Sequence, residues 1–263
     1  MTVEPSTYSD IRVDRADGVV TITLDREDAG NKFRHRTTLE LADALRRFRD
    51  DPASRVAVLT GAGERFFCIG GEHDEQDRLD NSVVLPIVDV YELIDSVPKP
   101  VVAAVNGFAV GGGNVLHTVC DLTIAAEHAV FRQVGPMVGS YDAGYGTWLL
   151  EETIGRKRAK EMWFLNQKYS AQDALVMGLV NEVVPGAELM DRARAVAREL
   201  CARSPLALGA LKGAFSAKHT GVLGQARLGH DQMLTLYLQT QEAHELSASF
   251  AERRAPDPDR FWR

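Results

Sequence analysis

The stretch that decides the fold is VPKPVVAAVNGFAVGGG, residues 97–113. Residues 101–105 form an apolar, β-branched run typical of a strand that is buried on both faces. Asn106-Gly107 is a turn signal, and the glycine triplet 111–113 precedes a helical pattern over residues 114–120. A strand, a turn and a helix in this order form the basic unit of an α/β fold.

The same order recurs on the N-terminal side of this stretch, whereas the C-terminal side becomes helical. We expect strands at 11–13, 19–24, 56–59 and 122–125, the first two joined by a hairpin at Asp17-Gly18. We expect helices at 37–50, 85–94, 157–165, 171–177, 189–203, 205–220 and 231–250. The charged stretch 72–81 is expected to be a loop or a frayed helix. The sequence therefore predicts an α/β body followed by an all-helical C-terminal part.

Composition and charge exclude several classes of function. The chain has 263 residues, 45% of them hydrophobic and 25% charged, and its net charge of −7 includes no Lys/Arg block. We therefore expect neither a nucleic-acid nor an anionic-membrane partner. No apolar run approaches the roughly 18 residues of a membrane helix, and the N-terminus lacks a signal peptide's apolar core. The three cysteines have no metal-ligand spacing. These features predict a cytoplasmic protein without a metal.

Two glycine-rich turns bring backbone N–H groups to the ends of strands. They are FFCIGG, residues 66–71, and GFAVGGG, residues 107–113. Glycine lets the backbone approach a ligand closely, and the second turn also opens a helix, whose N-terminus favours negative charge. A pair of such amides can stabilise an oxyanion or an enolate oxygen. Tight turns without a ligand are the alternative. A phosphate-binding loop is excluded, because neither G-x-x-x-x-G-K-S/T nor G-x-G-x-x-G is present here.

Several motifs together resemble one enzyme family. GAG (61–63), FFCIGGE (66–72), the stretch 97–113, CDLTIA (120–125) and residues 131–185 are similar, in order and spacing, to the crotonase (enoyl-CoA hydratase/isomerase) superfamily. The resemblance covers roughly residues 8–261. It implies a spiral of ββα units in residues 1–200 and a helical trimerisation region in residues 201–263, within one continuous family domain. It also implies an acyl-CoA substrate, no tightly bound cofactor, and a homotrimer or homohexamer.

The resemblance assigns roles to particular backbone groups. The N–H groups of Gly71 and Gly112 would form the oxyanion hole around the thioester carbonyl, with Gly70 beside the bound CoA. Glu72 stands where the family usually has Asp, which leaves the backbone donor intact. Arg34, in NKFR, resembles a residue that runs along the CoA phosphates; a surface ion pair is the alternative for it.

The two acids that handle water in hydratases of this family are missing. Their positions hold Val115 and Gly135, neither of which can move a proton, so hydration by that pair is excluded. An acid stands instead in VGSYDAGYG, residues 138–146. This motif resembles 2-ketocyclohexanecarboxyl-CoA hydrolases, which open a ring, and 1,4-dihydroxy-2-naphthoyl-CoA synthases, which close one. Asp142 is therefore the candidate acid/base, and Ser140 is its hydrogen-bonding neighbour.

Resemblance to the synthases also raises the possibility of bicarbonate. Some of these enzymes hold bicarbonate with a Gln, a Gly and a Trp, and the matching positions here are Gln133, Gly135 and Trp163. Gly135 leaves room where a glutamate would otherwise lie. The alternative is a turn glycine and an ordinary buried tryptophan.

Ring opening and ring closure both remain open at the level of sequence. The synthases carry a tyrosine in the loop after the first glycine turn and another in the last helix. The loop 72–84 contains no tyrosine, and Tyr237 lies one residue before the matching Leu238. One residue turns a helical side chain by ~100°, so Tyr237 is only a weaker helper. These departures favour hydrolytic ring opening of a cyclic β-keto acyl-CoA. Ring closure and a non-catalytic acyl-CoA-binding oligomer are the alternatives.

Overall fold

Successive segments of the chain alternate between two β-sheets. In this computed structural model, which describes residues 8–72, 87–138, 141–142, 144–227 and 234–260, one sheet has the strand order β1-β2-β3-β5-β7-β10 and the other β4-β6-β8-β9. The strands are β1 (Ile11–Ala16), β2 (Val19–Leu24), β3 (Val56–Gly61), β4 (Phe66–Cys68), β5 (Val101–Val105), β6 (Phe108–Val110), β7 (Leu122–Ala126), β8 (Val130–Arg132), β9 (Tyr169–Ser170) and β10 (Glu182–Val184). Each pair β3–β4, β5–β6 and β7–β8 gives one strand to each sheet, which is the repeating part of the fold.

Most neighbouring strands are parallel, as their apolar sequences predict. Among the described strands, only the pairs β1–β2 and β8–β9 are antiparallel. Asp17 and Gly18 both have positive φ, 54° and 80°, so the predicted hairpin turn is confirmed. The α/β body with buried, largely parallel strands is confirmed as well.

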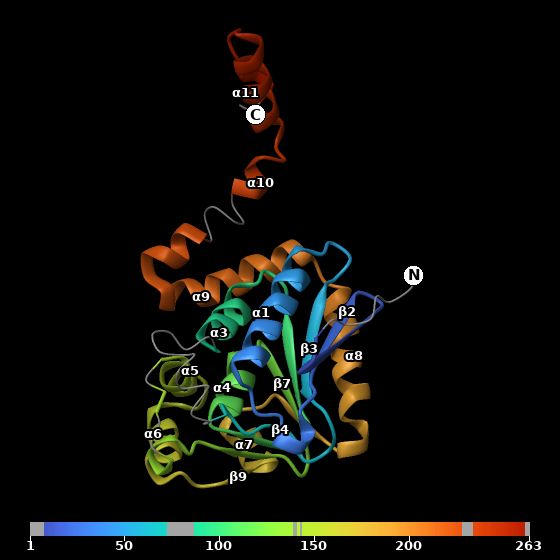
Figure 1. The fold of residues 1–263 in the computed structure, drawn as a ribbon. Coiled ribbons are helices and arrows are strands. Elements are labelled where there is room, and N and C mark those ends of the chain that lie inside the picture. Colours follow the sequence, from blue (N-terminus) through green and yellow to red (C-terminus); the bar gives the residue numbers. More distant parts are fainter. Residues whose placement is uncertain (1–7, 73–86, 139–140, 143, 228–233, 261–263) are drawn as a thin grey trace. The chain divides into compact units, whose positions relative to one another are not determined.

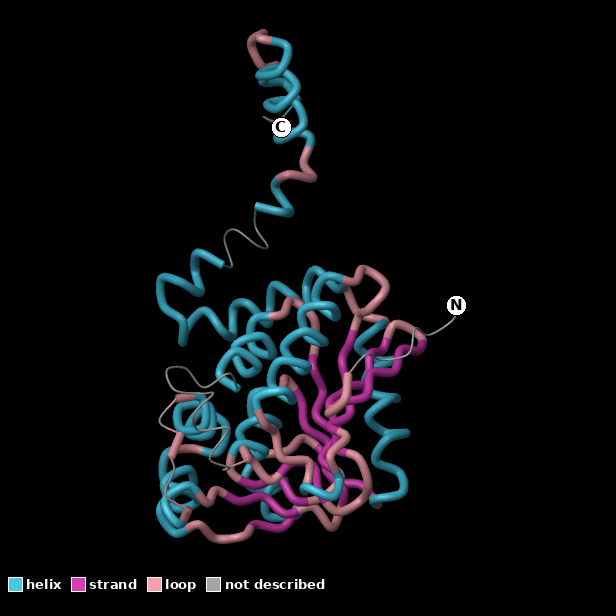
Figure 2. The backbone as a smooth tube through the Cα atoms, viewed as in Figure 1, coloured by secondary structure: helices cyan, strands magenta, loops and turns pink. Residues whose placement is uncertain are grey.

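Helices cover both faces of the larger sheet in the first part of the chain (Figures 1 and 2). The helices there are α1 (His35–Asp50), α3 (Ile87–Ser96), α4 (Gly112–Val119), α5 (Tyr145–Ile154), α6 (Arg156–Leu165), α7 (Ala171–Met177) and α8 (Leu189–Cys201), with short 3₁₀ turns at Glu27–Ala29, Gly135–Met137 and Gly186–Glu188. α8 lies on one face of the sheet, while α1, α3 and α4 lie on the other (Figure 1).

Successive side chains of β3 point to opposite faces of the sheet, which explains why helices cover both faces. Val56 and Val58 point into one apolar cluster, shared with Leu189 of α8, whereas Leu59 points into the other. Because successive side chains of a strand face opposite sides, a strand with apolar residues at every position must be covered on both. Every residue of β3 is buried.

The chain divides into two compact units, Met1–Pro205 and Leu206–Arg263. The predicted family boundary after residue 200 stays a prediction. The second unit contains most of α9 (Pro205–Arg227), then α10 (Thr235–Tyr237), α11 (Gln241–Glu252) and a 3₁₀ turn at Pro258–Arg260. Its described residues include no strand, as expected for a helical C-terminal region. Arg254, Arg260 and the backbone N–H of Asp257 all bind the Glu245 carboxylate, so the tail folds back on α11.

Some expectations about secondary structure were wrong. The predicted helix 231–250 is interrupted, because Thr240 is extended (φ −80°, ψ 156°) and its side chain accepts a hydrogen bond from the Ala243 N–H, which begins α11 anew. Gly221 is not helical (φ 57°, ψ −131°) and kinks α9, so the predicted end of the helix 205–220 is confirmed. The strands β6, β8, β9 and β10 were not predicted, since runs of two or three residues carry almost no periodicity. Residues 73–86 of the charged loop lie outside the described residues.

In the described ranges no helix is long and apolar enough to cross a membrane.

Candidate active site

The first glycine turn follows β4 and lies against the segment before α1. Phe33 N–H donates to Gly70 O at 3.0 Å, and Glu72 N–H donates to Phe33 O at 2.8 Å. Phe33 is therefore bonded to the residues on either side of Gly71, as in a parallel ladder. In this pattern the N–H of Gly71 itself points away from Phe33. Gly70 adopts φ +97°, a conformation that favours glycine. The turn thus directs one backbone donor away from Phe33.

The second glycine turn begins α4. Gly112 is the first helical residue, so its N–H has no acceptor within the helix, and the helix dipole favours an anion there. A Cβ on Gly113 would be 1.9 Å from Cys68 O, which shows how closely the start of α4 packs on the end of β4. Only glycine permits this approach.

The fold brings the two turns together. A Cβ on Gly70 would lie 3.3 Å from the Gly112 nitrogen. The ring of Phe33 lines both turns, since its atoms would be 3.1 Å from a Cβ on Gly71 and 2.5 Å from one on Gly112. The two predicted donors are therefore neighbours, and their role as an oxyanion hole stays a prediction.

Asp142 lies beside Val115, just before α5. Its Oδ1 accepts a hydrogen bond from Gly144 N–H at 2.8 Å. Its Oδ2 is 2.9 Å from the place that a Cβ on Gly146 would take, and Val115 Cγ2 is 2.8 Å from the same point. The carboxylate of Asp142 thus lies close to one of the two positions at which the hydratase acid is missing. Its predicted partner Ser140 lies outside the described residues.

Asn166, which sequence analysis did not single out, links Gln133 to Trp163 by hydrogen bonds. The side-chain amide of Asn166 donates to Gln133 O at 3.0 Å and to Trp163 O at 2.8 Å. Gln133 is 1% exposed, and within the described residues neither of its side-chain polar atoms has a hydrogen-bond partner. A buried amide in this state fits a small polar ligand.

Trp163 fits that ligand less well. Its indole N–H donates to Gly146 O at 2.7 Å, so in this structure the donor holds the first turn of α5. Gly135 is buried at the start of its 3₁₀ turn. The three predicted bicarbonate residues thus share one region, but Gln133 is the member whose polar atoms are available.

Arg34 forms an ion pair with Asp10. Its Nε and Nη2 each lie 2.8 Å from a carboxylate oxygen of Asp10, which also accepts from the Thr37 hydroxyl at 2.6 Å. Burial opposes ionisation of Asp10, but the hydrogen bonds from Arg34 and Thr37 outweigh it and lower the pKa of Asp10 to about 2. The Arg34 side chain is 42% exposed, and its predicted contact with CoA phosphates stays a prediction.

Arg26 extends this network to the first glycine turn. Its Nη2 is 2.9 Å from Glu72 Oε2, and its Nη1 donates to Lys32 O at 2.7 Å. Its Nε is 3.7 Å from Asp10 Oδ2. Arg26 thus links Glu72, which follows Gly71 directly, to the segment that carries Phe33.

A family model described as enoyl-CoA hydratase/isomerase matches residues 14–259. The chain belongs to this family.

Solved structures agree with this family assignment. An enoyl-CoA hydratase from Bacillus anthracis is 33% identical, with a TM-score of 0.74 over 95% of this chain and 98% of that one. An enoyl-CoA hydratase subunit I from Geobacillus kaustophilus is 29% identical, with a TM-score of 0.76 over 96% and 98%. DspI from Pseudomonas aeruginosa has a TM-score of 0.78 over 100% and 99%, but its 24% identity shows the fold alone.

The predicted crotonase fold is therefore confirmed, and the chain is an acyl-CoA enzyme of the enoyl-CoA hydratase/isomerase family. The predicted departure from hydratase chemistry stays a prediction. Tyr237, the predicted helper of this enzyme, belongs to the second unit, where it ends α10 with 38% of its surface exposed. Its role also remains a prediction.

Sequence analysis did not identify Tyr91, which lies at the candidate active site of this enzyme. Tyr91 is on α3, is 2% exposed, and its hydroxyl donates to Gly112 O at 3.2 Å. Burial, and then the negative charge of Asp142, raises the pKa of Tyr91 well above its usual range. A polar tip on the buried face of an amphipathic helix was the available signal, but the same pattern is common in cores.

Proposed function

We propose that this protein hydrolyses a cyclic β-keto acyl-CoA and opens its ring. The observation that carries the proposal is the Asp142 carboxylate beside Val115, near two backbone donors suited to an enolate. Val115 and Gly135 hold no acid, so this constellation favours chemistry that needs one carboxylate and a stabilised enolate.

In the proposed reaction Asp142 takes a proton from water as the oxygen adds to the ring ketone. The tetrahedral adduct then collapses to a carboxylic acid, and the bond between the former ketone carbon and the α-carbon breaks. The electron pair moves into the thioester, whose enolate oxygen is held by the N–H groups of Gly71 and Gly112. Protonation of the α-carbon completes the ring-opened acyl-CoA.

The two amides would contribute most of the barrier reduction. Loss of one such donor typically costs ~2.7–4 kcal/mol of transition-state stabilisation. The dipole of α4 adds to the donor at Gly112, because the developing charge lies at the helix N-terminus. Asp142 would take up the proton of the attacking water, a contribution of about 10²–10⁴-fold.

Ring closure of a 1,4-dihydroxy-2-naphthoyl-CoA type is the second candidate. The observation that favours it is Gln133, buried with both side-chain polar atoms unpartnered within the described residues. Gln133 would hold bicarbonate there, with room provided by Gly135, and bicarbonate would supply a base. The Trp163 N–H, which donates to Gly146 O, does not support this candidate.

Product analysis separates the candidates. The purified enzyme is incubated with 2-ketocyclohexanecarboxyl-CoA, o-succinylbenzoyl-CoA and crotonyl-CoA, each in bicarbonate-depleted and bicarbonate-supplemented buffer. We expect a ring-opened dicarboxylic acyl-CoA from the first substrate, at a rate independent of bicarbonate. Turnover of o-succinylbenzoyl-CoA that requires bicarbonate would establish ring closure instead. Hydration of crotonyl-CoA alone would refute both.

Asp142→Asn tests the assigned acid. Asn keeps the shape and can still accept from Gly144 N–H, but it cannot carry a proton. We expect turnover to fall about 10²–10⁴-fold while the affinity for CoA thioesters is retained. Asp191→Asn, at an 87% exposed side chain on α8, is the matched control and should leave turnover unchanged.

Unchanged turnover in Asp142→Asn would mean that another group moves the proton. Binding of all three thioesters without any turnover would favour a non-catalytic acyl-CoA-binding protein.

A further inference from the structure

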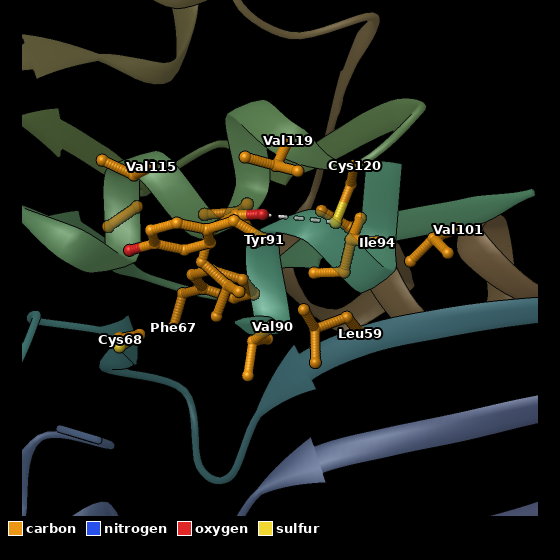
Figure 3. Packing of buried hydrophobic residues seen from close by; sticks show 14 of the residues in the cluster. Leu59, Phe67, Cys68, Val90, Tyr91, Ile94, Val101, Val115, Val119 and Cys120 are labelled. Atoms are coloured by element: carbon orange, nitrogen blue, oxygen red, sulfur yellow. Dashed lines mark hydrogen bonds between the residues drawn. The ribbon is translucent and has the colours of Figure 1, made fainter. Parts of the chain in front are cut away.

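The hydroxyl of Tyr91 is buried near three parts of the site, which are the start of α4, the end of β4 and Asp142. The side chain lies on the face of α3 that also buries Val90 and Ile94, and Figure 3 shows its ring among them. Its hydroxyl donates to Gly112 O at 3.2 Å and would be 3.3 Å from a Cβ on Gly112. In Figure 3 the hydroxyl end points toward the side where Val115 and Cys68 lie.

The surroundings of this hydroxyl are unusual for a residue that serves packing alone. The carboxylate of Asp142 lies close enough to contribute to the raised pKa of this hydroxyl. The ring also contacts that of Tyr145, with centroids 5.8 Å apart, at the first residue of α5. Its hydrogen bond to Gly112 O is longer than the ~2.7–2.8 Å usual between oxygens, so it is weak and easily exchanged for a bond to a ligand.

We propose that Tyr91 is a further catalytic residue, whose hydroxyl donates the proton that the thioester enolate needs at its α-carbon. This inference rests on the proposed enolate at Gly71 and Gly112. An enolate oxygen bound to the Gly112 N–H would lie roughly 3 Å from that nitrogen, and the α-carbon is only two bonds further on. A hydroxyl in contact with Gly112 is thus within reach of it, whereas Asp142 is placed to act on water.

Every proton that moves in this reaction is supplied and taken up within the site. The O–H bond of Tyr91 breaks as a C–H bond forms at the α-carbon, and the electron pair of the enolate becomes the new bond. The phenolate that remains takes the proton that Asp142 removed from water, and both residues return to their starting states. One water is added to the acyl-CoA overall. Burial disfavours the phenolate, which keeps Tyr91 protonated before the reaction and drives its rapid reprotonation afterwards.

Tyr91→Phe tests the proposal, because it removes the hydroxyl and keeps the ring. We expect turnover of the cyclic β-keto acyl-CoA to fall about 100-fold with KM nearly unchanged. Tyr169→Phe is the matched control, since Tyr169 is also a buried tyrosine, and its hydroxyl bonds to Glu161 rather than to the site. This variant should keep its turnover, and thermal unfolding of both variants should shift by similar amounts.

A second measurement does not depend on ring opening. The last step run backwards removes an α-proton, so hexanoyl-CoA in deuterated water should exchange its α-protons in the unmodified protein and in Tyr169→Phe, as followed by NMR. Tyr91→Phe should lose this exchange at least tenfold. Exchange at the unmodified rate in Tyr91→Phe, or no exchange in the unmodified protein, would overturn the proposal. If exchange depends on Tyr91 but no ring opens, the proposed substrate class fails and the role of Tyr91 stands.

Discussion

Phe33 organises both predicted donors of the site with one side chain. Its backbone pairs with Gly71, while its ring occupies the space beside Gly71 and Gly112. A side chain at Gly112 would meet the ring at 2.5 Å, so the glycine is required by packing as well as by any approach of a ligand. Phe33, which is 9% exposed, thus packs against both turns.

His117 has no part in the proposed chemistry, but it affects stability. It is fully buried on α4, its ring nitrogens face Thr123 and Asn114 at 3.3 and 3.2 Å, and its ring lies edge-on to Phe131. Burial lowers the pKa of His117 to about 3. The folded protein therefore keeps this imidazole neutral across the range in which an exposed histidine takes up a proton.

The expected consequence is a loss of stability in mild acid. The unfolded chain protonates His117 near pH 6.5 and the folded chain only near pH 3, so stability falls as the pH drops between these values. The slope for one proton is about 1.4 kcal/mol per pH unit. Urea unfolding at pH 7 and pH 5 should show a smaller loss for His117→Gln than for the unmodified protein, by about 2 kcal/mol. Equal losses would mean that His117 is protonated in the folded state.

At the scale of elements, the short contact between β4 and α4 determines where the site forms. Gly113 packs on Cys68 O, and Asn106 donates its side-chain amide to Gly61 O and Gly63 O, which ties the turn after β5 to the end of β3. The two glycine turns therefore follow adjacent strands of neighbouring repeats. Parallel strands end at the same edge of a sheet, which is why the donors converge.

The ion pair between Arg26 and Glu72 joins two further elements and should position the first donor. Arg26 and Glu72 are 14% and 23% exposed, so the pair is largely shielded from water. We expect Arg26→Gln and Glu72→Gln each to lower turnover about 10- to 100-fold with little change in KM, because small displacements of a donor are costly. The double variant should be no worse than either single variant, since both remove one interaction.

Arg12→Gln is the control for this experiment. Arg12 and Asp25 form an ion pair of the same length, 2.9 Å, but their side chains are 58% and 39% exposed, and such pairs contribute little. Turnover should stay unchanged in this variant. Additive losses in the Arg26/Glu72 double variant would show that the two residues act separately, and full activity in both single variants would show that Gly71 is held by Phe33 alone.

At the scale of the whole molecule, large apolar side chains remain exposed in both units. Tyr141, Phe164 and Val176 are 81%, 72% and 79% exposed in the first unit, and Phe250 is 88% exposed in the second. Apolar groups left in water favour association. Association of this kind agrees with the homotrimer or homohexamer that the family resemblance implies, which stays a prediction. Sedimentation velocity at micromolar concentration would detect it as three or six times the mass of one chain. A species with the mass of a single chain would contradict this.

The sequence by itself determined the α/β body, most of the helices and the two glycine turns. Buried strands such as 101–105, amphipathic helices and glycines at strand ends leave local patterns, because each depends on neighbours within a few residues. The motif around Asp142 and the absence of acids at Val115 and Gly135 were likewise readable along the chain.

Only the tertiary structure decided which of these residues meet. Phe33 touches both glycine turns, Asn166 joins Gln133 to Trp163, and Tyr91 reaches Gly112 from another helix. Trp163, which the resemblance to the synthases suggested as a bicarbonate ligand, donates its N–H to Gly146 O. Most of these contacts join residues far apart in the chain, and their geometry depends on packing between elements, which no local pattern records.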